Sequence, residues 1–226
     1  ALPEGTPEEK KFLLRFLGVE LVEVEDELCP LFPSEGARGV VKSMVESEAY
    51  GGRYVSPNQY ENELNVEAHY CTTGPEIWNQ TGGQVEWFFA AFGTCGTITG
   101  VGRYLKERNP NVRIIGIEPA SRQHRLSGIK RISDLPEEHR PKILDYSLLD
   151  DIVAVEDHEA FDAAIDLARS DGLMVGPTTG ALLHAARTLG IDARGTAVVI
   201  SPDDATKYMS TYAAYLAEKE SAQEDR

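Results

Sequence analysis

Two apolar runs separated by a glycine-rich turn and a short helical segment constrain the fold of this sequence most strongly. Residues 85–92 read VEWFFAAF and residues 112–117 read VRIIGI. Such nearly continuous apolar runs are typical of strands buried on both faces of a parallel sheet. The segment between them, 98–108, is expected to be a helix that ends near Asn109-Pro110. These elements predict a βαβ unit with a right-handed crossover, and therefore an α/β fold with a parallel sheet.

The same alternation of strand and helix continues on both sides of this unit. Helices are expected at 7–17, 37–48, 157–170, 179–189 and 206–218. Strands are expected at 19–25, 53–55, 151–155, 173–176 and 197–200. Gly18 is expected to end the first helix because glycine readily adopts the left-handed conformation of a helix stop. The polar stretch 56–84 has little periodicity, and we expect a loop with short helical pieces, which is either functional or a plain surface connection.

The acidic composition disfavours several classes of partner. With 22 basic and 37 acidic residues the net charge is −15, so the chain should repel nucleic-acid phosphates and anionic lipid surfaces. No apolar run reaches the roughly 20 residues of a membrane span, and no signal peptide is visible. We therefore expect no nucleic acid, no membrane and a cytoplasmic location. Three scattered cysteines, Cys29, Cys71 and Cys95, indicate neither a disulfide framework nor a metal motif.

The turn at 93–97 is the most informative of three small polar βα turns, the others being 176–180 and 201–206. Such turns lie at the carboxyl ends of parallel strands, where ligands bind. Two glycines in the first turn permit close approach of the backbone to a ligand, and two threonines add hydroxyls at a helix start. This combination predicts an anion cradle best matched to phosphate. The alternative is a tight structural turn.

Other interpretations of these turns are weaker. No lysine follows the glycines as a P-loop requires, and the spacing G-x-x-G-x-x-x-G is not that of a dinucleotide fingerprint. Glu118 does stand 22 residues beyond Gly96, where a ribose-binding acid would lie, although Pro119 suggests a strand end instead. Thr178 or Thr179 could cap a helix rather than bind a ligand. Asp203-Asp204 is likewise a capping candidate or a weak magnesium candidate; the five histidines show no metal-ligand spacing, and we expect no metal.

Several motifs, taken in order, resemble the cysteine synthase family. They are Gln59-Tyr60-Glu61-Asn62, Thr72-Thr73-Gly74-Pro75-Glu76-Ile77-Trp78, the segment from Gly93 to Gly100, Ile117-Glu118-Pro119, Gly176-Pro177-Thr178-Thr179-Gly180-Ala181 and Lys207-Tyr208-Met209-Ser210-Thr211. That family consists of fold-type II enzymes that depend on pyridoxal phosphate (PLP), and it includes O-acetylserine sulfhydrylases and cystathionine β-synthases.

The resemblance implies a fold, a reaction and an assembly. The fold would have three layers around a parallel sheet, with residues 1–56 as the remainder of a smaller N-terminal domain and 57–226 as the larger PLP-binding domain. The reaction would be β-replacement on an O-activated serine by a sulfur nucleophile, which makes cysteine, in a homodimer. Its partners would be a small amino-acid substrate and a sulfur donor. Alternatives are a cystathionine β-synthase or cysteine desulfhydrase-like relative, a non-catalytic protein with a PLP pocket, and a nucleotide-binding oxidoreductase.

The resemblance also assigns candidate site residues. The phosphate of PLP would be bound by Gly93, Thr94, Cys95, Gly96 and Thr97. Thr178 would meet the pyridine nitrogen, and Gln59 would lie near the substrate carboxylate. Two departures are visible: Cys95 stands where many relatives have glycine, and 127–131 (SGIKR) replaces the usual G-x-G-x-G-F segment, which leaves the sulfur donor and the amino-acid substrate open.

Two family motifs are absent from the sequence. Neither the S-x-K-D/N-R type motif that carries the Schiff-base lysine nor the T-S-G-N-T-G loop occurs. Lys42 comes nearest to the lysine of the first motif, but it lacks the following Asp-Arg and falls in an expected helix. We therefore expect the chain to lack the family's N-terminal third, the Schiff-base lysine to lie upstream of Ala1, and no catalytic residue to be present in the chain itself.

Overall fold

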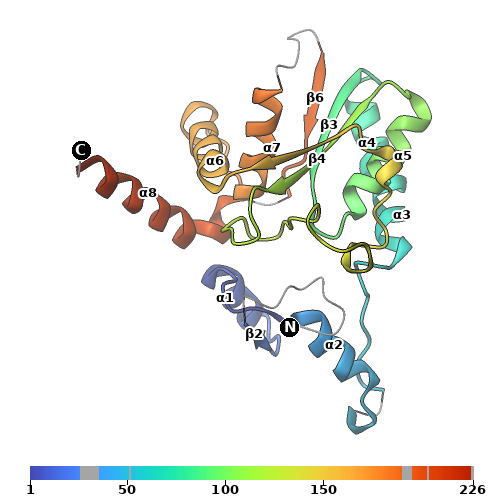
Figure 1. The fold of residues 1–226 in the computed structure, drawn as a ribbon, viewed down its shortest axis with the longest axis vertical. Helices are drawn as coiled ribbons and strands as arrows, with labels where there is room; N and C mark the ends of the chain where they lie inside the picture. Colours follow the sequence, from blue (N-terminus) through green and yellow to red (C-terminus); the bar gives the residue numbers. More distant parts are fainter. Residues whose placement is uncertain (26–35, 51, 190–194, 203, 225–226) are drawn as a thin grey trace.

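The computed structural model describes residues 1–25, 36–50, 52–189, 195–202 and 204–224. Its centre is a four-stranded parallel sheet in the order β5-β4-β3-β6 (Figure 1). The strands are β3 (Val85–Ala91), β4 (Arg113–Pro119), β5 (Asp151–Val155) and β6 (Thr196–Val199). The expected βαβ unit is therefore present, and its two strands are direct neighbours in the sheet, with Phe89 paired to Ile115.

Helices cover both faces of this sheet, which confirms the three-layer arrangement. One face carries α6 (Asp157–Asp171) and α7 (Pro177–Thr188), whereas the other carries α3 (Glu63–Cys71), α4 (Thr73–Gln80) and α5 (Gly96–Arg108). Successive side chains of β3 enter different cores: Phe89 packs with Phe161 under α6, and Phe88 packs with Leu105 of α5. Both faces of the strand are thus apolar because both faces are covered.

A second, two-stranded parallel sheet lies in the N-terminal part of the chain. It pairs β1 (Leu2–Pro3) with β2 (Glu23–Val24) and is accompanied by α1 (Glu8–Phe16) and α2 (Gly36–Glu46). Helix α1 ends as expected at Gly18, whose φ is +79°. The N–H groups of Gly18 and Val19 donate to the carbonyls of Arg15 and Leu14, at 2.9 and 3.0 Å. This is a Schellman motif, which satisfies carbonyls at the end of the helix.

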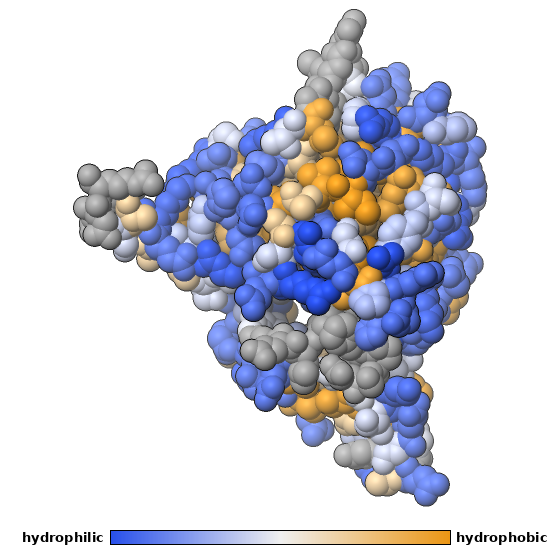
Figure 2. Space-filling model, in the orientation of Figure 1, coloured by the Kyte–Doolittle hydropathy of each residue, from blue (hydrophilic) through white to orange (hydrophobic). Residues whose placement is uncertain are grey.

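The remaining elements connect these parts. They are the 3₁₀ turns η1 (Glu48–Tyr50), η2 (Glu137–His139), η3 (Tyr146–Leu148) and η4 (Ala205–Tyr208), and the C-terminal helix α8 (Met209–Glu224). Helix α1 contacts η4, where Lys10 Nζ donates to the hydroxyl of Tyr208 at 2.6 Å, and the start of α8, where Ser210 N donates to Glu9 at 2.6 Å. Hydrophilic residues cover most of the face shown in Figure 2, and hydrophobic residues gather over the central strands.

Three expected strands differ in the structure. The strand at 19–25 is reduced to Glu23–Val24, and 173–176 forms only an isolated antiparallel bridge between Val175 and Asp204. Residues 53–55 form no strand, and Val55 is 90% exposed. A β-branched, alternating sequence favours an extended backbone, but a strand also needs a neighbour with which to pair. Within the described residues, no helix combines the length and apolarity needed to cross a membrane.

Candidate functional site

The turn between β3 and α5 lies at the carboxyl edge of the sheet. Its backbone is sharply bent, because Cys95, the residue just before α5, adopts a left-handed conformation with φ of +72°. The backbone N–H groups of Thr94, Cys95, Thr97 and Ile98 have no hydrogen-bond acceptor among the described residues. Free N–H groups at the start of a helix, together with its positive dipole end, favour an anion. The turn therefore fits a phosphate group, which would supply the missing acceptors.

Close packing against α3 fixes the back of this turn. A Cβ on Gly96 would collide with the side chain of Asn65, and a Cβ on Gly100 would collide with the carbonyl of Val66. A Cβ on Gly93 would lie 2.9 Å from the carbonyl oxygen of Gly128. The glycines of this segment thus permit the turn to pack closely against α3 and against the backbone of Gly128.

Two residues of α3 that the sequence interpretation missed contact the threonines of this turn. Asn65 Nδ2 donates to Thr94 Oγ1 at 3.0 Å and to the backbone carbonyl of Gln59 at 2.8 Å. His69 Nε2 lies 3.1 Å from Thr97 Oγ1, and its Nδ1 lies 3.0 Å from Thr73 Oγ1. The sequence signal was present in the spacing: residues four apart on a helix share one face.

The side chain of Cys95 points away from this edge. It is 3% exposed and packs among the buried residues beneath α5, with Ile98 and Phe92. Burial raises the pKa of its thiol, so the thiolate form is disfavoured. Cys95 can therefore contribute to the predicted phosphate site through its backbone N–H, and not through its thiol.

An open cleft of about 2010 Å³ adjoins the turn, and Gly93, Thr94 and Gln59 line it. Among the described residues, seven basic but three acidic side chains line this cleft, in a chain that has 22 basic and 37 acidic residues. The basic residues are Arg38, Lys42, Arg122, Arg125, Lys130, Arg131 and Lys142. This concentration of positive charge in an acidic chain favours anionic ligands.

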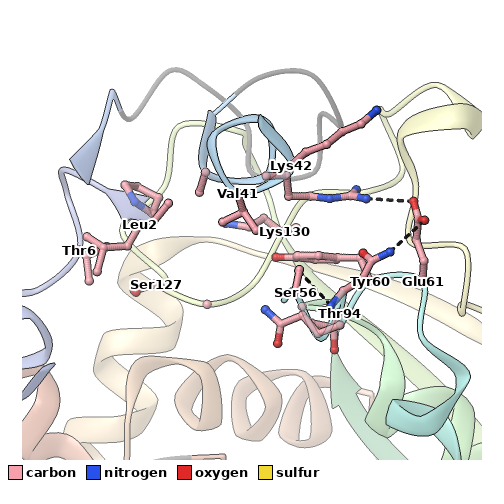
Figure 3. A pocket seen from close by; sticks show the side chains of 18 of the residues that line it. Leu2, Thr6, Val41, Lys42, Ser56, Tyr60, Glu61, Thr94, Ser127 and Lys130 are labelled. Carbon is pink, nitrogen blue, oxygen red and sulfur yellow. Dashed lines mark hydrogen bonds and ion pairs between the residues drawn. The ribbon is translucent and has the colours of Figure 1, made fainter. Parts of the chain in front are cut away.

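The loop that carries Gln59 is anchored across the cleft. Glu61 accepts a hydrogen bond from Arg38 of α2 at 2.9 Å and from Asn58 at 3.2 Å, and it lies 3.4 Å from Lys142 Nζ. Burial alone would raise the pKa of Glu61, but the hydrogen bonds from Asn58 and Arg38 outweigh it and lower the pKa. Figure 3 shows these interactions around Tyr60, whereas the side chain of Lys42 extends away from Thr94. Lys42 instead lies 3.9 Å from Glu46 on the exposed surface of α2.

The two adjacent threonines of the 176–180 turn do not cap α7. Gly176 is the N-cap and Pro177 is the first helical residue, so the capping interpretation of Thr178 and Thr179 is wrong. Both threonines are 5% exposed. Thr179 donates to the hydroxyl of Ser201 at 3.0 Å, just beyond β6, whereas the Thr178 hydroxyl has no hydrogen-bond partner among the described residues.

Thr179 contacts Ser201 just beyond the carboxyl end of β6, and β6 runs parallel to its neighbour β3. The 176–180 turn and the turn at 93–97 therefore lie at the same edge of the sheet. A ligand at that edge could meet both turns, which places the two predicted parts of the site within one region.

Two other sequence candidates have structural roles. Glu118 is 2% exposed and accepts hydrogen bonds from the backbone N–H groups of Ile132 and Ser133, at 2.9 and 3.0 Å, so its carboxylate is not available as a ribose-binding acid. Asp204 accepts a hydrogen bond from Thr206 N at 2.9 Å and caps η4. Asp203 lies outside the described residues. The part of the chain that is described holds no group of three or more metal-ligating side chains.

The family model described as "Pyridoxal-phosphate dependent enzyme" matches residues 1–203. The chain belongs to this family. The fit of the turn at 93–97 to a phosphate agrees with that membership, and the resemblance seen in the sequence motifs is confirmed. PLP is the cofactor of this family of enzymes.

Curated relatives of the chain include cysteine synthases. The chain is 37% identical over 216 residues to cysteine synthase from Aquifex aeolicus (strain VF5), covering 93% of the chain and 63% of that relative. It is 34% identical over 211 residues to cysteine synthase B from Escherichia coli (strain K12), covering 93% of the chain and 66% of that relative. The chain therefore spans somewhat less than two thirds of the length of these relatives.

Solved structures of the same fold agree. The crystal structure of cysteine synthase from Entamoeba histolytica superimposes with a TM-score of 0.75 at 28% identity, covering 90% of this chain and 60% of that one. The crystal structure of an O-ureido-L-serine synthase gives a TM-score of 0.78 at 28% identity, covering 93% and 66%. These neighbours confirm the fold-type II architecture expected from the sequence.

Proposed function

We propose that the chain is the PLP-binding part of a cysteine synthase, in which residues 93–97 hold the cofactor phosphate. The observation that carries this proposal is the set of backbone N–H groups at Thr94, Cys95, Thr97 and Ile98, which have no acceptor among the described residues. They lie beside a cleft in which basic side chains outnumber acidic ones among the described lining residues. Gly93 and Gly96 belong to the same turn: Gly96 keeps it close to Asn65 of α3, and Gly93 keeps it close to the backbone of Gly128. The names of the curated relatives support cysteine synthesis as the reaction.

The other two assignments follow from position. Thr178 supplies a neutral hydroxyl at the edge of the sheet, and we assign it to the pyridine nitrogen of the cofactor. A neutral hydroxyl does not hold that nitrogen protonated as an aspartate would, which suits β-elimination better than transamination. Gln59 lines the cleft in a loop anchored by Glu61, and we assign it to the carboxylate of the amino-acid substrate.

The bound cofactor supplies an electron sink for the substrate carbanion. The chain's own residues orient it: the turn at 93–97 fixes the phosphate, and the loop at 56–62 closes one side of the cleft. The substrate would be an O-activated serine and the second partner a sulfur nucleophile. We further propose the division into domains at residue 56, assembly as a homodimer, a cytoplasmic location, and a Schiff-base lysine that is none of Lys42, Lys130 or the other lysines of this chain.

The experiment measures cysteine formation from O-acetylserine and sulfide by the full gene product, together with release of sulfide from cysteine. The proposal predicts that cysteine formation dominates. Dominant sulfide release from cysteine would instead assign the desulfhydrase-like alternative. If the protein showed neither activity, the cysteine synthase proposal and the desulfhydrase-like alternative would both be contradicted. Borohydride reduction and peptide mapping then locate the lysine bound to PLP; a pyridoxyl group on Lys42 or Lys130 would contradict the assignment of that lysine to another part of the enzyme.

A further inference from the structure

Helix α3 presents Asn65 and His69, one turn apart, to the two threonines of the turn at 93–97. Asn65 contacts Thr94 at 3.0 Å and His69 contacts Thr97 at 3.1 Å. Each hydroxyl has a single proton, which can go to α3 or to an anion in the turn. The direction of the two hydrogen bonds from α3 therefore decides whether the threonines attract or repel a phosphate.

The orientation of Asn65 follows from its second partner. Its Nδ2 lies 2.8 Å from the backbone carbonyl oxygen of Gln59, which can only accept a hydrogen bond. The same nitrogen faces Thr94 Oγ1, so the asparagine donates and the threonine oxygen accepts. The hydroxyl proton of Thr94 is then available to an anion.

His69 has two partners and thus two arrangements. Burial lowers its pKa, so the imidazole is neutral near neutral pH and carries one proton. With that proton on Nδ1, the Nε2 atom would accept the only hydroxyl proton of Thr97, whose oxygen lone pairs would then face the phosphate. With the proton on Nε2, the ring donates to Thr97 while Nδ1 accepts from the hydroxyl of Thr73.

We propose that His69 is a positioning residue that holds the Nε2–H form and so keeps the hydroxyl of Thr97 as a donor to the cofactor phosphate. Asn65 likewise keeps the hydroxyl of Thr94 as a donor to the phosphate, because its own Nδ2 donates to the Thr94 oxygen. This inference rests on the proposed function, because it requires the turn at 93–97 to bind phosphate. Loss of one charge-assisted hydrogen bond should weaken binding of a phosphate ligand by about tenfold or more.

The test compares binding of PLP and of pyridoxal, which lacks the phosphate, to the chain and its variants. In His69→Leu, the dissociation constant for PLP should rise by about tenfold or more, while that for pyridoxal should stay the same. His69→Gln places an amide N–H near the position of Nε2 and should restore most of the preference for PLP. If His69→Leu weakened the binding of PLP and of pyridoxal equally, His69 would have a general structural role and the inference would be overturned.

A second measurement needs no variant. Long-range ¹H–¹⁵N spectra of the wild-type chain distinguish the two neutral forms of a histidine, and the Nε2–H form is expected for His69. The Nδ1–H form would overturn the inference even if His69→Leu failed to fold. If the wild-type chain bound PLP no better than pyridoxal, the proposed phosphate site itself would fail; a normal preference for PLP that survives in His69→Leu would remove only the role of His69.

Discussion

The side chain of Asn65 occupies the space that a Cβ on Gly96 would need. This contact joins the third helix to the start of the fifth, at the turn proposed to bind phosphate. The absence of a side chain at position 96 therefore serves packing, and the proposed ligand lies on the other side of the turn.

Gly96→Ala should destabilise the fold by about 1–3 kcal/mol, because the new methyl group overpacks against Asn65. In the background of Asn65→Ala the same change should cost less, since the space is then open. Urea unfolding of the two single variants and the double variant measures the coupling, which should be about 0.5–3 kcal/mol and favourable. Additive effects would contradict the packing relationship, and Gly102→Ala, whose Cβ would meet its nearest atom at 3.5 Å, serves as the control.

Replacement of Cys95 should reveal the cost of its left-handed backbone. Cys95→Gly and Cys95→Ala both remove the buried sulfur, but only glycine adopts a φ of +72° without strain. The glycine variant should therefore be more stable than the alanine variant by about 1 kcal/mol, as measured by thermal or urea unfolding. If the alanine variant is equally stable, the conformation of Cys95 is not strained.

Thr178→Val should separate cofactor binding from stability. The Thr178 hydroxyl has no hydrogen-bond partner among the described residues, so unfolding of the cofactor-free variant should change little. Affinity for PLP and the absorbance of the bound cofactor should change, and Thr178→Ser should restore both. Thr178→Asp should favour a protonated pyridine nitrogen, because an opposite charge at contact stabilises the cation.

The matched control for this series is Thr179→Val. It removes the hydrogen bond to Ser201 and should cost about 1 kcal/mol of stability with an unchanged cofactor spectrum. Should the two valine variants behave in the opposite way, the pyridine contact would belong to Thr179.

His124 should make the stability depend on pH. Its Nδ1 accepts a hydrogen bond from Leu126 N at 3.1 Å, which requires an unprotonated nitrogen. Burial, aided by the charge of Lys130 and opposed by Asp157, lowers the pKa of His124 to about 4. Between that pH and the unfolded pKa of about 6.5, the unfolded state binds more protons than the folded state. The contribution of His124 to stability is therefore present above about pH 6.5 and is lost as the pH falls toward 4.

His124→Asn keeps an acceptor for Leu126 but cannot titrate. Urea unfolding at several pH values from 4.5 to 7 gives the unfolding free energy as a function of pH. Its slope should be smaller for this variant than for the wild-type chain, by an amount that corresponds to up to about one bound proton. Parallel profiles would show that another group carries the dependence in this range.

The parts of the fold that could be predicted from the sequence are those with strong local patterns. The runs at 85–92 and 112–117 are apolar on both faces, and only a covered parallel sheet accommodates that pattern. The glycines and threonines at 93–97 identified the turn because ligand-binding turns of such sheets have this chemistry. The short extent of the strand after residue 19 and the lack of a strand at 53–55 could not be predicted, since pairing there depends on residues distant in the chain.

The arrangement around the turn also depended on contacts that a sequence does not display. Asn65 and His69 are 29 and 28 residues from the threonines they contact, and a helix pattern alone does not identify the segment that its polar face meets. Nor does the sequence show whether the thiol of a cysteine in a glycine-rich turn faces the ligand or the core. The thiol of Cys95 faces the core. Thr178 looked like a cap because Pro177 could not be placed within the helix from the sequence alone.

The most direct test of the account is an amide NMR titration of the ¹⁵N-labelled chain with PLP, repeated with inorganic phosphate. Both ligands should shift the amide signals of Thr94, Cys95, Thr97 and Ile98 most strongly, because these N–H groups would donate to the phosphate. Pyridoxal without phosphate should leave those signals in place. Shifts confined to the basic segment at 122–131, with the turn at 93–97 unaffected, would contradict the proposed phosphate site.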